Sequence, residues 1–161
     1  MMKTLCILPL LFLFMIAGAQ TKPAVKPVKP VQPAIKGPAP KIQASLGGKD
    51  GGNIDLTVAR VLVDFPLLLK DDKGNVYPIK QCTFVYKRIS SFEEENTGTK
   101  RTGWEYLVKE LRNNEQLDEF WRTEVKETLQ KGEELHFQKI LADSKKGYLV
   151  PVKGIVFKIN P

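Results

Sequence analysis

The sequence predicts a mainly β domain that is antiparallel and sandwich-like, with a helical insertion at about residues 104–131; an α+β fold is the alternative. Three observations lead to this prediction. Apolar residues near the C-terminus recur at every second position, which is typical of strands with one buried face. A similar alternation runs through residues 54–89. Between these two parts the apolar spacing changes to three and four, which favours helix.

The closing segment, Gly132–Ile159, predicts three short strands, each preceded by a glycine. Leu135 and Phe137 alternate with polar residues, and the Val, Ile, Tyr and Phe of this segment suit a pleated, half-buried surface. His136 is the only histidine and stands between Leu135 and Phe137. We therefore expect its side chain to point away from the face that they bury and to be solvated.

Residues 54–69 also alternate, with a change of phase near Ala59 that a β-bulge or a short break would explain. Lys70–Asn75 is a turn sequence, and residues 76–89 continue as a strand, so that the two runs predict a hairpin. Cys82 lies within this apolar run. We expect it to be buried and inert, with a reactive thiol as the alternative.

The segment Ser90–Arg101 is polar and has no apolar period, which indicates an exposed loop. It contains three adjacent carboxylates, Glu93–Glu95. Such a run is usually solvated, and binding of a cation or of a basic partner is the alternative.

The segment Trp104–Lys131 predicts two short helices or one kinked helix, with Asn114 as a candidate N-cap and Gly132 as the stop. Trp121 and Phe120 are expected in the core, with an exposed aromatic patch for ligand binding as the alternative. The apolar positions at helical spacing are Trp104, Leu107, Val108, Leu111, Leu117, Phe120, Trp121, Val125 and Leu129.

The net charge of +7 belongs to the N-terminal part of the chain. Six lysines and no acidic residue precede Ser45, so the predicted domain, Ser45–Pro161, has 19 basic and 18 acidic residues and a net charge of +1. This balance argues against a nucleic-acid-binding face.

Residues Met1–Ala19 have the pattern of a signal peptide: Lys3, an apolar run, and the small residues Ala17–Ala19. Retention as an N-terminal anchor is the alternative. Cys6 would leave with a cleaved leader. We therefore expect an exported protein.

Residues Gln20–Ala44 contain a proline at about every third or fourth position and no acidic residue. Proline fixes φ and removes backbone donors, so this segment predicts a disordered, extended tether. It is expected to be a spacer; alternatively its lysines contact an anionic envelope surface or its prolines a partner groove. The candidate contacts are Lys22, Lys26, Lys29, Lys36 and Lys41.

A glycine-rich loop, residues 45–53, follows the tether. A phosphate cradle needs Gly-Lys-Ser/Thr before a helix, whereas Asp50 follows Lys49 here, so we reject nucleotide binding. The glycines instead predict positive φ angles in a tight approach to a sheet. The loop residues of interest are Gly47, Gly48, Lys49, Gly51 and Gly52.

Four segments, 46–54, 82–86, 129–140 and 151–159, are together similar to the periplasmic C-terminal region of the GldM family of gliding-motility and type IX secretion proteins. The resemblance spans about residues 45–160. It implies a β-rich sandwich module in the periplasm or cell envelope of a Gram-negative, Bacteroidota-type bacterium, with envelope proteins as partners. The family's long helical domains and motor-coupling membrane segment have no counterpart in this sequence, so energy transduction is not carried over.

From these observations we expect an exported, non-enzymatic binding or scaffold module, accessory to the gliding or type IX secretion machinery. A small carboxylate-dependent hydrolase, acting on envelope material through Glu93 or Glu105, is the alternative. A third hypothesis is weak adhesion of the tether to anionic polymers. No cofactor, metal site or nucleic-acid partner is expected, and a homodimer is compatible with the sequence.

Overall fold

The structure is a computed structural model and describes residues 40–144 and 146–161. These residues form a mainly β domain with two sheets and two helices, as the sequence predicts. In chain order the elements are β1 (Ile42–Leu46), β2 (Gly52–Ile54), α1 (Leu56–Leu62), β3 (Leu67–Asp71), β4 (Val76–Tyr77), β5 (Ile79–Glu93), β6 (Lys100–Arg112), α2 (Glu119–Thr128), β7 (Glu134–Asp143), β8 (Leu149–Val152) and β9 (Ile155–Ile159).

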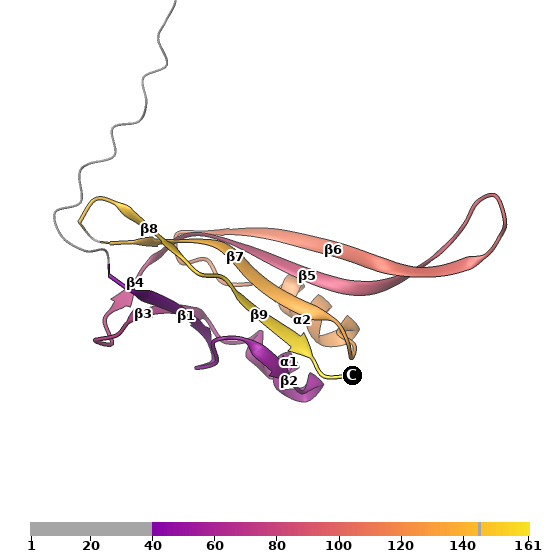
Figure 1. Ribbon diagram of the computed structural model, residues 1–161, viewed down its shortest axis with the longest axis horizontal. Helices are drawn as coiled ribbons and strands as arrows, with labels where there is room; N and C mark the ends of the chain where they lie inside the picture. The colour runs from indigo at the N-terminus through magenta and orange to yellow at the C-terminus, as the bar shows by residue number, and fades with distance from the viewer. Residues whose placement is uncertain (1–39, 145) are drawn as a thin grey trace, which may run out of the picture. The chain divides into compact units, whose positions relative to one another are not determined.

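The main sheet has the strand order β2-β9-β7-β5-β6, and β8 pairs with the C-terminal end of β7. Its pairs are antiparallel except for β2 and β9, which run parallel, so the expectation of an antiparallel fold holds for all but this pair. The predicted three closing strands are confirmed as β7, β8 and β9. A small sheet of order β1-β3-β4 completes the fold (Figure 1).

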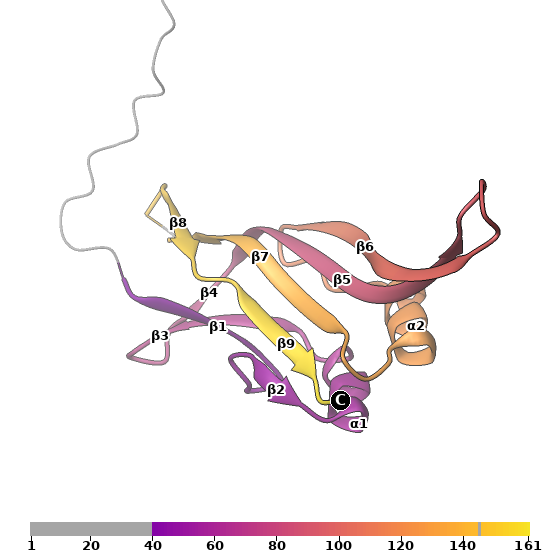
Figure 2. The same ribbon diagram turned by 45° about the vertical axis from the view of Figure 1, so that its right-hand side comes forward.

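One face of the main sheet, here named the core face, carries the buried aromatic residues Phe84, Tyr86, Phe137 and Phe157. Buried residues of the small sheet, α1 and α2 join them in one hydrophobic core. The Trp121 ring of α2 meets the Phe84 ring edge-on, with centroids 5.9 Å apart. Both helices therefore lie on the core face, and the opposite, outer face of β5 and β6 has no helix over it (Figure 2).

A β-bulge in β7 keeps its apolar residues on the core face. The register of β7 against β5 shifts by one residue between the pairs Gln81↔Leu141 and Thr83↔Gln138. Lys139, between them, has a left-handed φ of 51°. The extra residue lets Phe137 and Ile140, three positions apart, both point into the core, which explains the irregular period of this strand.

The expectation of a strand through residues 54–69 is wrong in part, because Leu56–Leu62 is helix α1. Ala59 and Leu62 are buried and stand three residues apart, so they share one face of the helix. The phase change near Ala59 thus marks this helix rather than a bulge. The predicted hairpin survives in short form, with β3 and β4 joined by the turn 72–75.

The expected helical insertion is correct only in its second half. Residues 104–111 belong to strand β6, and α2 occupies residues 119–128. The N-cap is Asp118, whose carboxylate accepts a hydrogen bond from Trp121 N at 3.0 Å, and not Asn114. Asn114 has a φ of 64° and accepts from Ile79 N instead. The helix ends at Thr128, before Gly132.

The polar segment Ser90–Arg101, expected to be a loop, is strand in half of its residues. β5 continues to Glu93 and β6 starts at Lys100, and only residues 94–99 form the connecting loop. The pairing of β5 with β7 ends at Lys87, whereas its pairing with β6 continues to Glu93, so the hairpin runs on past the neighbouring strand (Figure 1).

The folded part starts earlier than the predicted boundary at Ser45. Strand β1 begins at Ile42, and both Ile42 and Ala44 are buried, so residues 42–44 belong to the domain and not to a tether. Lys41 is exposed just before this strand. The predicted leader, and the tether lysines Lys22, Lys26, Lys29 and Lys36, lie outside the described residues.

Candidate protein-interaction surface

The outer face of β5 and β6 carries apolar side chains that are open to solvent. Trp104, Tyr106 and Val108 are 49%, 59% and 55% exposed, and Ile89 is 36% exposed. Val85, on the same face, is almost buried, with 7% of its surface exposed. We name these five residues the outer patch. Because β6 is the last strand in the order of the main sheet, the patch lies along the margin of that sheet.

Pairing between β5 and β6 assembles the outer patch from two strands. Val85 lies opposite Val108, and Ile89 lies opposite Trp104. Between these pairs, Lys87 places its Nζ 4.3 Å from the centre of the Trp104 ring. A cation above an indole ring orients the ring without covering its edges. The patch is therefore a mostly apolar surface with one ordered positive charge within it.

A polar cluster borders the outer patch on its β7 side. Glu134 receives a hydrogen bond from Lys87 Nζ at 3.2 Å and lies 2.7 Å from His136 Nε2. Burial acts to raise the pKa of Glu134, but the contacts with His136 and Lys87 outweigh it and lower that pKa. His136 is on the outer face, as predicted; it is half-buried, with this carboxylate as its partner, and is not simply solvated.

Within the described part of the chain, no strand pairs with the edge of β6 that faces away from β5. This edge is open only before Arg112, because Arg112 N donates to the Glu115 carboxylate at 3.2 Å and Glu115 N donates to Arg112 O at 2.9 Å. At its two ends, Asn113 N donates to Lys80 O at 3.2 Å and Glu94 N donates to Thr99 O at 3.0 Å. Backbone groups of an antiparallel strand point alternately to either side. Odd-numbered residues therefore bond to β5, and the N–H and C=O of Trp104, Tyr106 and Val108 point outward.

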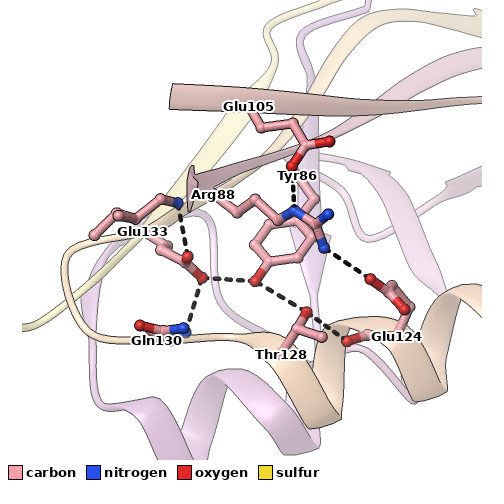
Figure 3. Close-up of polar contacts among 8 residues, drawn as sticks. Tyr86, Arg88, Glu105, Glu124, Thr128, Gln130 and Glu133 are labelled. Atoms are coloured by element: carbon pink, nitrogen blue, oxygen red, sulfur yellow. Dashed lines mark hydrogen bonds and ion pairs between the residues drawn. The ribbon is translucent and has the colours of Figure 1, made fainter. Parts of the chain in front are cut away.

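The core face of the same strands also carries polar groups, but there they are paired. Glu133 is 1% exposed, and its carboxylate accepts hydrogen bonds from Tyr86 Oη at 2.6 Å, Ile89 N at 2.8 Å and Gln130 N at 2.8 Å (Figure 3). Burial, and then this bond to Glu133, raises the pKa of the Tyr86 hydroxyl. The network joins β5 to the turn before β7.

Arg88 extends this network to α2 and β6. Its Nε donates to Glu105 and its Nη1 to Glu124, each at 2.8 Å (Figure 3). Glu105, proposed above for a hydrolase, is thus one arm of an ion-pair bridge. Glu93 lies opposite Lys100, five positions away along β6, or about 17 Å at ~3.4 Å per residue. The structure does not bring the two carboxylates together.

The glycine loop is a turn between β1 and β2 in which all four glycines have positive φ, as predicted. Gly51, with a φ of 113°, shows the reason most clearly, because a Cβ there would lie 2.8 Å from Val156 O of β9. The glycines thus let the chain pass close to the sheet. Lys49 is exposed, and Gly52 lies opposite Phe157 in β9.

The described surface also has hollows away from the outer patch. A polar one of about 380 Å³ is lined by Lys41, Asp71, Tyr77 and Tyr148 among others. Its Asp71 is held by Asn75 and Tyr77, and the Asn75 side chain is the main cause that lowers the pKa of Asp71 to about 2. An apolar one of about 440 Å³ lies between β3, β4 and residues 114–116. Lys41, which lines the polar hollow, is the one candidate tether lysine that lies within the described residues.

The single cysteine of the described residues, Cys82, is buried on the core face, as expected. Burial raises the pKa of its thiol to about 12, so the thiolate is scarce at neutral pH. The Cys82 side chain lies opposite Leu111 of β6 and belongs to the hydrophobic core. This geometry supports a packing role rather than a reactive one.

Sequence reasoning missed the outer patch. It assigned Trp104 and Val108 to the buried face of a helix and left Tyr106 without a role. Every second residue from Trp104 to Val108 is apolar, which is a strand signal, but Leu107 is apolar too and hides it. Phe120, expected in the core beside Trp121, is instead 71% exposed on α2.

No protein-family model and no curated protein matches this chain. Neither helix of the described residues is long and apolar enough to cross a membrane. Within residues 40–144 and 146–161, no three side chains of His, Cys, Asp or Glu are grouped so that they could hold a metal ion.

Proposed function

We propose that this chain is an exported, non-enzymatic protein-binding module of the bacterial cell envelope, accessory to the gliding and type IX secretion machinery. The observation that supports binding is the outer patch, whose three half-exposed residues lie side by side on one strand. The leader, the tether and the family resemblance support the compartment and the kind of partner.

The composition of the outer patch suits protein recognition. Tyr and Trp are enriched at protein interfaces because each offers a large, rigid apolar area together with a polar tip. Exposed apolar patches on soluble domains mark interaction sites when a polar border surrounds them. Here Glu134 and His136 provide that border on one side, and Lys87 provides a charge inside it.

The experiment that tests this proposal is chemical cross-linking and capture of the tagged full chain from an envelope fraction of the native cells. We expect gliding or type IX secretion components to be recovered, identified by mass spectrometry. The double variant Trp104→Thr with Tyr106→Thr should lose them. Threonine keeps the β propensity of an edge strand while removing the aromatic surface.

Phe120→Ala is the matched control, because Phe120 is a still more exposed aromatic residue but belongs to α2 on the other face of the sheet. It should capture the same components as the wild-type chain. Recovery of the wild-type chain alone would contradict the proposal, and so would equal capture by the double variant and the wild type.

A further inference from the structure

We propose that the open edge of β6 pairs antiparallel with the same edge of a second copy of this chain, with Leu107 on the two-fold axis. This inference concerns the backbone edge of the strand and goes beyond the proposed function, which concerns the side chains of the outer face. Three features support it: an unprotected edge, outward-pointing backbone groups, and a self-complementary arrangement of charge.

The middle of β6 lacks the features that normally keep edge strands apart. Proteins protect open edges with prolines, short strands, or charged residues along the edge. β6 is 13 residues long and contains no proline. Its residues 102–108 include one charged side chain, Glu105, whose charge Arg88 already balances at 2.8 Å.

The backbone phase of β6 allows pairing about Leu107. The N–H and C=O groups of Tyr106 and Val108 point outward, as derived above from the hydrogen bonds at both ends of the hairpin. With Leu107 on the axis, Tyr106 of one copy faces Val108 of the other. These would be hydrogen-bonded pairs on either side of a non-hydrogen-bonded pair, which is a regular antiparallel ladder.

Charge selects this register over its neighbours. With Leu107 on the axis, Glu105 of each copy faces Lys109 of the other, so the pairing brings opposite charges together twice. An axis at Glu105 would place Glu105 against itself and Arg101 against Lys109. An axis at Tyr106 would place Lys100 against Arg112. Opposite charges across a ladder stabilise it, and like charges destabilise it.

The two charged residues are also available for such pairing. The side chains of Glu105 and Lys109 are 41% and 27% exposed. Each already has a partner within its own chain, Arg88 for Glu105 and Asp118 for Lys109, so both are held in place near the open edge. A second copy would extend these pairs into a row of alternating charges beneath the joined sheets. The two outer patches would then form one continuous apolar face on the opposite side.

Charge exchange tests both the pairing and its register. In Glu105→Lys, and separately in Lys109→Glu, the proposed register sets like charges at positions 105 and 109 against each other in a homodimer. Mixing the two variants restores opposite charges in both pairs. Analytical ultracentrifugation of the full chain should therefore show a wild-type dimer and weaker self-association of each variant. The expected loss is about ten-fold or more in Kd, with recovery in the equimolar mixture.

The mixture also controls for folding, because a variant that fails to fold cannot be rescued by its counterpart; circular dichroism checks each variant alone. A monomeric wild type would overturn the proposal, and so would a dimer that neither substitution weakens, or a mixture no stronger than its components. Binding of a different protein to this edge by a monomeric wild type would overturn it as well. Both substitutions lie on the core face and leave the outer patch unchanged. A failure of the dimer test therefore does not decide the capture test of the proposed function.

Discussion

The two faces of the β5–β6 hairpin are built from alternate residues of the same strands, yet they meet different surroundings. On the core face, Phe84 and Tyr86 are fully buried, and the Glu133 carboxylate has three hydrogen-bond donors. On the outer face, Trp104 and Tyr106 are about half exposed. One face holds the domain together, whereas the other presents apolar area that the fold itself does not use.

This difference indicates where substitutions should affect stability and where they should affect binding. A buried side chain contributes through the area that it removes from water and through close packing. An exposed side chain on an edge strand contributes little to either, so its removal has a small effect on unfolding.

The largest effect on stability is expected from Phe84→Ala on the core face. Phe84 is 0% exposed and contacts the rings of Trp121 and Phe137. Its truncation should lower the free energy of unfolding by about 3–5 kcal/mol, because it removes apolar burial and leaves a cavity. Urea denaturation measures the change. Val108→Ala, on the outer face, is the control and should cost about 1 kcal/mol or less.

Glu133→Gln tests the polar part of the core face. The amide would turn an NH₂ group toward some of the donors that now share the carboxylate, so the free energy of unfolding should fall by about 1.5–3 kcal/mol. Tyr86→Phe in the same background should then cost less than it does in the wild type. Additive effects of the two substitutions would show that the bond between them carries no coupling energy.

Asp118→Ala tests the cap of the helix that covers the core face. Asp118 accepts from Trp121 N at 3.0 Å and pairs with Lys109 at 3.1 Å. Loss of the cap should lower the free energy of unfolding by about 1 kcal/mol, whereas Asp118→Asn should retain most of it. A loss equal for both variants would mean that the charge, and not the cap, is the larger contribution.

Glu134→Gln tests the border of the outer patch through pH. The pKa of Glu134 is lowered in the folded state, so its ionised form stabilises the fold above the unfolded pKa, and this contribution disappears as pH falls through the folded pKa. We expect the variant to be less stable than wild type at pH 7 by up to about 1 kcal/mol. The difference should shrink as pH falls below the ordinary value of 4.5 and vanish once pH is below the lowered folded pKa. A difference that persists at pH 2 would contradict this assignment.

The parts of the fold that could be predicted are those in which a single face is apolar. The alternation of Leu135 and Phe137 correctly predicted β7, and the helical spacing of Trp121 and Val125 correctly predicted α2. In these elements the period of the sequence reports directly which side meets the core.

Prediction failed where apolar residues occur on both faces or where the period is interrupted. In β6, Leu107 points to the core face while Tyr106 and Val108 point outward, so the run looks helical. The exposed apolar residues of the outer patch and the wrong assignment of this strand therefore have the same origin. Short helix α1 was missed because about two turns of helix and a bulged strand leave similar apolar positions. The partners of Glu133 depend on segments 47 residues apart, which local pattern does not report.

The most direct test of the account is to measure unfolding and capture together on the Trp104→Thr, Tyr106→Thr double variant. We expect a change of about 1 kcal/mol or less in the free energy of unfolding, together with loss of the envelope components that the wild-type chain recovers. A variant that unfolds several kcal/mol more easily would show that Trp104 and Tyr106 hold the fold together, which contradicts the contrast between the two faces. A variant that is as stable as the wild type and captures the same components would show that the outer patch is not a binding surface.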